Sequence, residues 1–407
     1  MLQGRYRVVT AVKCVYEGQQ TSTPQSVTPL ELNLSLTTLQ PYDCLCVSYV
    51  LSCYPVIKLN MSWCHIGDTG AEMLIKHYPN KNNSGHVLQE LKFWNNDLTV
   101  TGVEHVVKIV MKSSASLRVL NVSDNPIRDD GISLIVEHLH GLNELSVYNC
   151  KLSAKGASYV GRFLKNCFLQ YLNMHSNPIS DDGISLIVEG LQCNKTLTKL
   201  NVGNCGISAK GAMCIGELLK ENCTLKVLYM NDNPVGDAGI SQLMDRLCLN
   251  TTLTELSVEN CEISAKGTTC NSCNTGGSGL PDIGARCIGE LLQENTVLEV
   301  LWMRENNIGD AGISQLMDGL CLNTTLTELM VQDCGISAKG TTCNSCNTGG
   351  SGLPDMYTLT LGPHVYMSDK TQPHVLQITC FTSLKYWELQ HSTEVVHVVQ
   401  SVTYQVT

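Results

Sequence analysis

The sequence predicts an α/β fold, a curved solenoid in which short strands alternate with helices. A frame of the form LxxLxV, seen in Leu197–Val202, recurs along the chain. Its second leucine, the key leucine of each repeat, stands at Leu120, Leu145, Leu172, Leu200, Leu228, Leu256, Leu301 and Leu329. The intervals are 25, 27, 28, 28, 28, 45 and 28 residues, and a period near 28 residues is typical of stacked repeat architectures.

Each repeat is predicted to be a strand followed by a helix. Around Leu200 apolar and polar residues alternate, which is strand periodicity, so Leu200 and Val202 are expected to face the core. Residues 183–191 carry apolar residues at helical spacing. Asp181 and Asp182 precede them, where carboxylates favour the amino end of a helix.

One such repeat cannot fold alone. Roughly eight apolar side chains contribute about 2 kcal/mol each, whereas ordering ~28 residues costs at least ~1 kcal/mol per residue. Stacking must supply the difference. Adjacent strands are expected to form a parallel sheet on the concave face, and the wider helices to form the convex face of a horseshoe.

The fifth residue after each key leucine alternates between asparagine and cysteine. We expect each of these side chains to turn inward and bond the backbone of the turn that leaves the strand. The alternating set is Asn125, Cys150, Asn177, Cys205, Asn233, Cys261, Asn306 and Cys334.

With this alternation of xxNPIxDDG and xNCxISAKG units, the chain resembles the ribonuclease-inhibitor class of leucine-rich repeats. The resemblance covers Leu117–Gly340 firmly and Val56–Ser116 less regularly. It implies a non-enzymatic protein-protein interaction module that binds through its concave sheet, like the recognition region of a NOD-like innate immune receptor. Three alternatives stay open: a ribonuclease-inhibitor-like inhibitor, a Ran-type GTPase-activating protein, and a scaffold in cytoskeletal or ciliary assemblies.

The domain prediction has three parts. Residues 1–55 are a degenerate N-terminal repeat or cap, residues 56–340 the repeat domain with an insertion at 268–284, and residues 341–407 a non-repeat tail. The twenty residues 263–282 recur unchanged at 336–355 and continue differently each time. We interpret this duplication, and with it the tail, as a gene-model artefact; a genuine flexible insertion on the outer face is the alternative.

The composition indicates which type of partner and which cellular compartment to expect. The net charge of −10 and the pI of about 5.5 argue against a nucleic-acid surface and favour a basic or neutral protein partner of unknown identity. Most of the 21 cysteines recur at repeat positions, which favours reduced cysteines in a cytoplasmic protein. No stretch predicts a signal peptide or a membrane span. The oligomeric state is left open.

The sequence contains no convincing catalytic, metal or cofactor motif. The two CxxC pairs, Cys270 with Cys273 and Cys343 with Cys346, have zinc-site spacing but lie in glycine-rich stretches without obvious partners. The segment GISAKG lacks the Gly-Lys-Ser/Thr ending of a phosphate loop. We therefore expect no metal, no cofactor and no enzymatic activity.

The candidate binding residues come from strand periodicity. Residues one and three positions after each key leucine should point out from the concave sheet, and several are aromatic or arginine, the types that dominate interface energetics. Acidic residues border this strip and could meet a basic partner. The predicted partner-binding residues are Lys92, Trp94, Tyr148, His175, Tyr229, Asp232, Glu259, Trp302, Arg304 and Glu305.

Overall fold

The structure is a computed structural model that describes residues 2–18, 29–78, 88–112, 117–265 and 284–336, together with the backbone of 360–361 and 377–380. The chain divides into two compact units, Met1–Ile207 and Ser208–Thr407. Most of the predicted insertion, both CxxC pairs and most of the tail lie outside the described residues.

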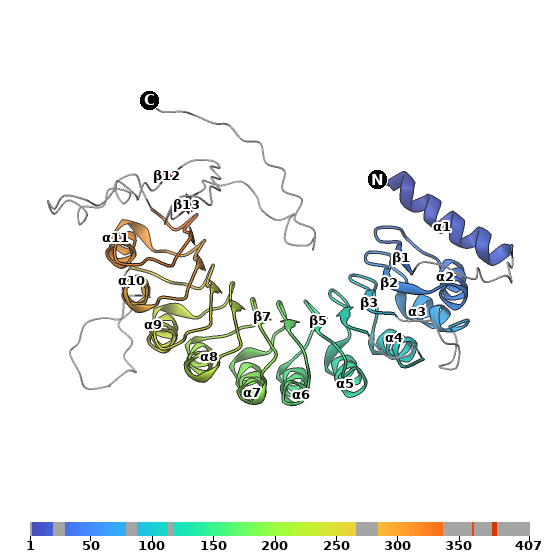
Figure 1. Cartoon of the computed structure of the whole chain (residues 1–407), viewed down its shortest axis with the longest axis horizontal. Helices are drawn as coiled ribbons and strands as arrows, with labels where there is room; N and C mark the ends of the chain where they lie inside the picture. The colour runs from blue at the N-terminus through green and yellow to red at the C-terminus, as the bar shows by residue number, and fades with distance from the viewer. Residues whose placement is uncertain are drawn as a thin grey trace, which may run out of the picture. The chain divides into compact units, whose positions relative to one another are not determined.

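Unit 1 alternates helices with short parallel strands (Figure 1). Its elements are α1 (Leu2–Glu17), β1 (Leu30–Asn33), α2 (Pro41–Cys53), β2 (Val56–Asn60), α3 (Gly67–Ile75), β3 (Glu90–Lys92), α4 (Val100–Lys112), β4 (Val119–Asn121), α5 (Arg128–His138), β5 (Glu144–Ser146), α6 (Ala154–Leu164), β6 (Tyr171–Asn173), α7 (Ser180–Cys193) and β7 (Lys199–Asn201). Every strand from β1 to β7 pairs in parallel with the next.

Unit 2 continues the same alternation of helix and strand. Its elements are α8 (Ala209–Glu221), β8 (Val227–Tyr229), α9 (Gly236–Leu247), β9 (Glu255–Ser257), α10 (Gly284–Glu294), β10 (Val300–Trp302), α11 (Gly309–Leu320), β11 (Glu328–Met330), β12 (Thr360–Leu361) and β13 (Gln377–Cys380). Strands β8 to β11 pair in parallel, and β13 pairs with both β11 and β12.

Within each unit the strands line one side, here called the inner face, and the helices line the other (Figure 1). The key leucines pair in register from strand to strand, as Leu172 does with Leu200. The 45-residue interval does not interrupt this pairing, because Leu256 of β9 is still opposite Leu301 of β10. These findings confirm the predicted α/β solenoid of parallel strands backed by helices.

The core of each repeat consists of the residues that the frame predicts. All eight key leucines from Leu120 to Leu329 are at most 1% exposed, and Val202 is fully buried. No helix among the described residues has the length and apolar character that crossing a bilayer requires.

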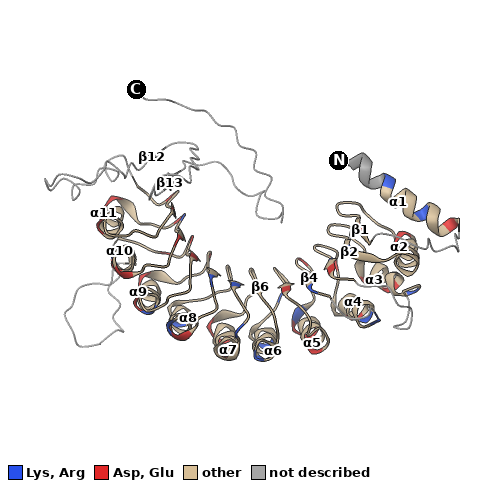
Figure 2. Cartoon of the chain, viewed as in Figure 1, with Lys and Arg blue, Asp and Glu red and all other residues tan. Residues whose placement is uncertain are grey.

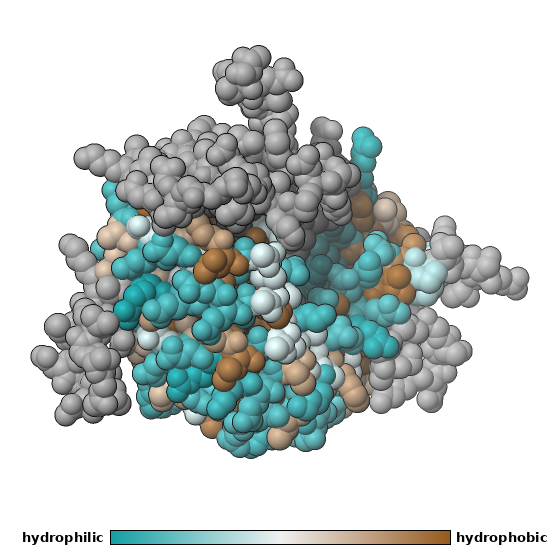
Figure 3. All heavy atoms as spheres, turned by 60° about the vertical axis from the view of Figure 1, so that its left-hand side comes forward, coloured by the Kyte–Doolittle hydropathy of each residue, from teal (hydrophilic) through white to brown (hydrophobic). Residues whose placement is uncertain are grey.

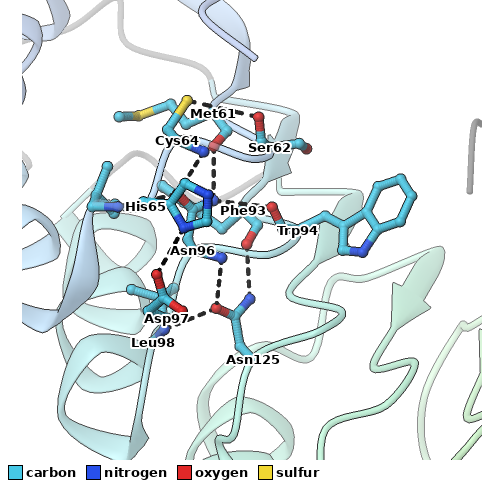
Figure 4. Close-up of polar contacts among 11 residues, drawn as sticks. Met61, Ser62, Cys64, His65, Phe93, Trp94, Asn96, Asp97, Leu98 and Asn125 are labelled. Atoms are coloured by element: carbon cyan, nitrogen blue, oxygen red, sulfur yellow. Dashed lines mark hydrogen bonds and ion pairs between the residues drawn. The ribbon is translucent and has the colours of Figure 1, made fainter. Parts of the chain in front are cut away.

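The alternating Asn and Cys positions link each repeat to the one before it. The Asn125 side chain accepts hydrogen bonds from the backbone N–H groups of Asn96 and Leu98, at 3.0 and 2.8 Å, and donates to the carbonyl of Phe93 at 2.8 Å (Figure 4). The thiol of Cys150 donates to the carbonyl of Val122, in the preceding repeat, at 3.3 Å. The inward-turning role predicted for these residues is confirmed.

Glycine pairs bring neighbouring helices into backbone contact in two places. A Cβ atom on Gly161 of α6 would lie 2.2 Å from the carbonyl oxygen of Leu186 in α7, and one on Gly190 would lie 2.1 Å from the oxygen of Gly161. Gly289 of α10 and Gly319 of α11 repeat this contact in unit 2. A side chain at these positions would therefore push the two helices apart.

We expect Gly161→Ala to lower the free energy of unfolding by about 2–3 kcal/mol, because the added methyl group overlaps a backbone oxygen. This reverses the usual gain of ~1 kcal/mol when alanine replaces glycine inside a helix. Gly216→Ala is the matched control, since its Cβ would lie 3.3 Å from the nearest atom, the Gln242 oxygen. Urea unfolding of both variants checks this; equal effects would contradict it.

Candidate partner-binding surface

Two aromatic rings stack across a strand on the inner face of unit 2. Tyr229 of β8, Ser257 of β9 and Trp302 of β10 are direct neighbours in the sheet register. Because serine is small, the Tyr229 and Trp302 rings meet above it, with their centroids 5.6 Å apart and their planes 10° from parallel. Both rings remain half-buried.

A carboxylate accepts a hydrogen bond from the polar atom of each ring. The hydroxyl of Tyr229 donates a hydrogen bond to Oε1 of Glu255. The indole Nε1–H of Trp302 donates to Oε1 of Glu328 at 2.8 Å. Each glutamate immediately precedes a key leucine, so the repeat itself places a carboxylate beside each ring. Glu255 lies on β9, the strand between the two ring-bearing strands, and Glu328 lies on β11, next to the strand of Trp302.

Arg304 and Glu259 form a two-point ion pair beside the rings. The guanidinium Nε lies against Oε1 of Glu259, and Nη2 lies 3.1 Å from Oε2. The side chains are only 28% and 12% exposed, respectively. The predicted site residues Arg304 and Glu259 therefore neutralise each other.

The predicted acidic residues Asp232 and Glu305 occupy turns with left-handed backbone. Their φ angles are 60° and 56°, a region that asparagine and aspartate tolerate better than most residues. Asp232 accepts hydrogen bonds from the side-chain amides of Asn231 and Asn260, at 2.6 and 2.9 Å. Glu305 is exposed.

We expect Glu305→Asn to raise the free energy of unfolding by about 0.5–1 kcal/mol, because asparagine fits the left-handed turn with less strain. The same change removes a negative charge from the inner face, so binding of a basic partner should weaken. Thermal unfolding and a titration with that partner measure the two effects separately. A loss of stability would show that the Glu305 side chain makes a stabilising contact.

In unit 1 the predicted residues contact neighbouring side chains. Trp94 packs edge-on against Trp63, with ring centroids 5.5 Å apart, and its Nε1–H donates to Asp124. Tyr148 lies against His175 at 5.2 Å. Lys92 forms an ion pair with Glu90, with an N–O distance of 2.7 Å.

The sequence argument missed Trp63 and Asp124. Trp63 stands four positions after its key leucine, at a turn with a φ of 62°. Most other repeats place Asn, Asp or Ser at that position, as at Asn95 and Ser176. A tryptophan where small polar residues recur was the signal that could have revealed this ring.

The comparisons with known proteins agree with the repeat geometry. The "Leucine Rich repeat" family model matches residues 56–74, 113–136, 165–188, 193–216, 221–244, 249–269, 294–317 and 322–342. The ribonuclease inhibitor of Mus musculus is 25% identical over 351 residues, covering 74% of this chain and 76% of the inhibitor. That of Sus scrofa is 29% identical over 298 residues, covering 71% and 61%. This chain is a ribonuclease-inhibitor-like leucine-rich-repeat protein.

A second kind of relative of this leucine-rich-repeat protein is much longer. The NACHT, LRR and PYD domains-containing protein 3 of Homo sapiens is 28% identical over 221 residues. The match covers 52% of this chain and 19% of that protein. About half of this chain therefore aligns with one segment of this relative.

The two units of this leucine-rich-repeat protein differ in charge. The described residues of unit 1 include 16 Asp and Glu and 16 Lys and Arg. Those of unit 2 include 16 Asp and Glu but only 6 Lys and Arg. The excess of negative charge therefore lies in unit 2, where acidic residues occur on strands, turns and helices (Figure 2).

Buried thiols make the stability of the protein sensitive to alkaline pH. Burial raises the pKa of the Cys205 thiol to about 12, and that of Cys261 to about 12, from an ordinary value near 9. In the unfolded chain both thiols ionise as the pH passes 9, while in the folded protein they stay protonated. The unfolded state then binds fewer protons, so stability falls as the pH rises from about 9 to about 12.

At pH 10.5 we expect each of these two thiols to lower the free energy of unfolding by about 1–2 kcal/mol relative to pH 8. The double variant Cys205→Ala, Cys261→Ala should lose correspondingly less stability over that interval. Urea unfolding at the two pH values measures the difference. An unchanged pH dependence in the variant would contradict the role of the thiols.

Proposed function

We propose that this chain is a non-catalytic binding module that holds a basic protein partner against the inner face of unit 2, like the recognition region of a NOD-like receptor. One observation carries the proposal: the excess negative charge and the carboxylate-flanked Tyr229–Trp302 pair lie in the same unit. The acidic field would speed the encounter with a basic surface. The rings would then supply the apolar contact area.

Binding fits the chemistry of this surface better than catalysis does. Among the side chains that could act as acids or bases, Arg304 is paired with Glu259 and Tyr229 with Glu255. The Arg304–Glu259 pair is already ordered, so it loses little side-chain entropy when a partner docks. Shape and charge complementarity over several repeats would provide the affinity.

The face of the molecule that Figure 3 shows is mainly hydrophilic in its described residues. Hydrophilic side chains dominate there, and hydrophobic residues lie in small separate groups. Isolated exposed apolar residues such as Leu249 and Leu322, 61% and 66% exposed, are common on protein surfaces. The inner face remains the better candidate for a partner.

We place the activity in the cytoplasm. Five repeat-position thiols are buried and donate hydrogen bonds to carbonyl oxygens, a role that requires the reduced form. They are Cys64, Cys150, Cys205, Cys261 and Cys334. A reducing compartment preserves this form.

A second candidate is inhibition of a ribonuclease. It is favoured by the relatives named ribonuclease inhibitor, of which the matched segments span 76% and 61%. In this case the partner would occupy the same acidic face, and enzyme activity would fall as the complex forms.

A calorimetric titration with a basic ribonuclease and with other basic proteins tests both candidates. We expect binding that weakens at least about tenfold between 50 and 300 mM salt, because the contact depends on charge. An acidic protein of similar size is the control and should not bind. Loss of ribonuclease activity on complex formation would favour the inhibitor. No binding to any basic protein would count against the proposed function.

A further inference from the structure

A polar atom without a partner is buried beneath the aromatic pair of unit 2. Ser257 is 1% exposed, and its Oγ has no hydrogen-bond partner among the described residues. Side chains on one face of a sheet alternate along each strand, and Ser257 is in register with Tyr229 and Trp302. The hydroxyl therefore lies on the inner face, in the space between the two ring-bearing strands.

An unsatisfied buried hydroxyl is unfavourable, and a ligand that brings a donor to Ser257 would remove that cost. Alanine at this position would fill the same space without a polar atom. The hydroxyl thus provides a hydrogen-bond acceptor in the space beneath the rings. Together with the carboxylates of Glu255 and Glu328, it indicates a polar ligand.

The spacing of the strands would allow the rings to separate. Tyr229 and Trp302 are anchored two strand spacings apart, which is roughly 9–10 Å, whereas their ring centroids have closed to 5.6 Å. A planar group stacked between two rings needs about 7 Å, twice the usual carbon-carbon contact distance. Side-chain rotation alone could therefore admit such a group, with no movement of the sheet.

We propose that Tyr229, Trp302 and Ser257 form a receptor for one arginine side chain of the basic partner, a proposal that rests on the proposed function. The planar guanidinium stacks between the two nearly parallel rings and donates an N–H to the Ser257 hydroxyl below. Glu255, on the same strand as Ser257, and Glu328, bonded to the Trp302 indole, balance its positive charge.

Arginine matches this site better than lysine does. Its guanidinium is flat, stacks on aromatic faces and carries five N–H donors in a fixed plane. A lysine ammonium is compact and strongly hydrated, so it could contact one ring face but could not fill a slot between two. An apolar side chain would leave the Ser257 hydroxyl and the flanking carboxylates without a positive partner.

The probes that test the proposal are three blocked pentapeptides, Gly-Gly-X-Gly-Gly, in which X is arginine, lysine or citrulline. Citrulline keeps the shape of arginine without its charge. The full chain is labelled with 5-fluorotryptophan, and the Trp302 signal is assigned by its loss in Trp302→Phe. We expect the arginine peptide to shift this fluorine signal and to bind about tenfold more tightly than the lysine peptide. The citrulline peptide should cause no shift.

Two substitutions of Ser257 separate the role of this hydroxyl in binding arginine from a general effect of charge. We expect Ser257→Ala to weaken arginine-peptide binding about fivefold, because the acceptor is lost while the rings stay in place. Ser257→Leu should abolish the arginine preference by filling the space beneath the rings. Thermal unfolding shows whether each variant is folded.

The outcomes distinguish the two proposals. Equal affinity for arginine and lysine peptides, or an unchanged affinity in Ser257→Ala, would overturn the arginine receptor while the proposed function stands. The arginine receptor would also be overturned if a basic protein binds but no peptide shifts the Trp302 fluorine signal. If basic proteins also fail to bind, the proposed function itself is wrong.

Discussion

Replacing Asn177 with alanine is expected to lower the free energy of unfolding by about 3–5 kcal/mol, the largest effect that we predict for one polar side chain. Asn177 is fully buried, and its oxygen accepts from the backbone N–H groups of Cys150 and Leu152, at 3.0 and 2.9 Å. Its amide donates to the carbonyls of Val147 and Met174, at 2.8 and 2.7 Å. Alanine would remove this partner from the N–H groups of Cys150 and Leu152 and from the carbonyl of Val147.

Cys205→Ala is the control for this prediction. The two residues occupy the same position in successive repeats, and the Cys205 thiol donates a hydrogen bond to the carbonyl of Met174 at 3.3 Å. Replacing the thiol with a methyl group should lower the free energy of unfolding by about 1 kcal/mol. Urea unfolding of the two variants would show a large and a small decrease. Equal decreases would contradict the view that asparagine holds neighbouring repeats together.

The second large effect concerns the partner. We expect Trp302→Ala to weaken binding of a basic protein at least about thirtyfold, or about 2 kcal/mol, as for other central interface tryptophans. The change removes one ring of the stacked pair and the indole N–H that bonds Glu328. Both the apolar contact and the position of the carboxylate would be lost.

Phe168→Ala is a suitable comparison, since Phe168 is 70% exposed in the connection between α6 and β6, away from the strands of the inner face. Its removal should change affinity less than about threefold. A titration of both variants with the same basic protein measures the difference. If Phe168→Ala weakened binding as much as Trp302→Ala, the inner face of unit 2 would not be the contact surface.

The sequence predicted the repeat architecture well because the frame leaves few alternatives. A leucine such as Leu200 must be buried when apolar residues alternate at strand spacing, and it is 1% exposed. The asparagine and cysteine positions followed from the same frame. The helix contact at Gly161 could not be predicted, since it depends on how far one helix lies from the next.

The candidate surface could be predicted only in part. Periodicity indicated which side chains leave the inner face, but the stacking of Tyr229 on Trp302 depends on the small Ser257 between them. The pairing of Arg304 with Glu259 depends on rotamers that a period does not specify. Which of these groups a partner uses stays a prediction.

The most direct test of the binding surface compares two variants with the same change in charge. One carries three glutamate-to-glutamine substitutions on the inner face of unit 2, at Glu255, Glu305 and Glu328, and the glutamine oxygens can still accept the ring hydrogen bonds. The other carries three on the outer helices, at Glu217, Glu221 and Glu290, where all three side chains are exposed.

Calorimetry at 50 mM salt would give the affinity of each variant for a basic protein. We predict that the inner-face variant binds at least about thirtyfold more weakly than the unmodified chain, and the outer-helix variant less than about threefold more weakly. Equal losses from both variants would show that only net charge matters. No loss from the inner-face variant would contradict the proposed binding surface directly.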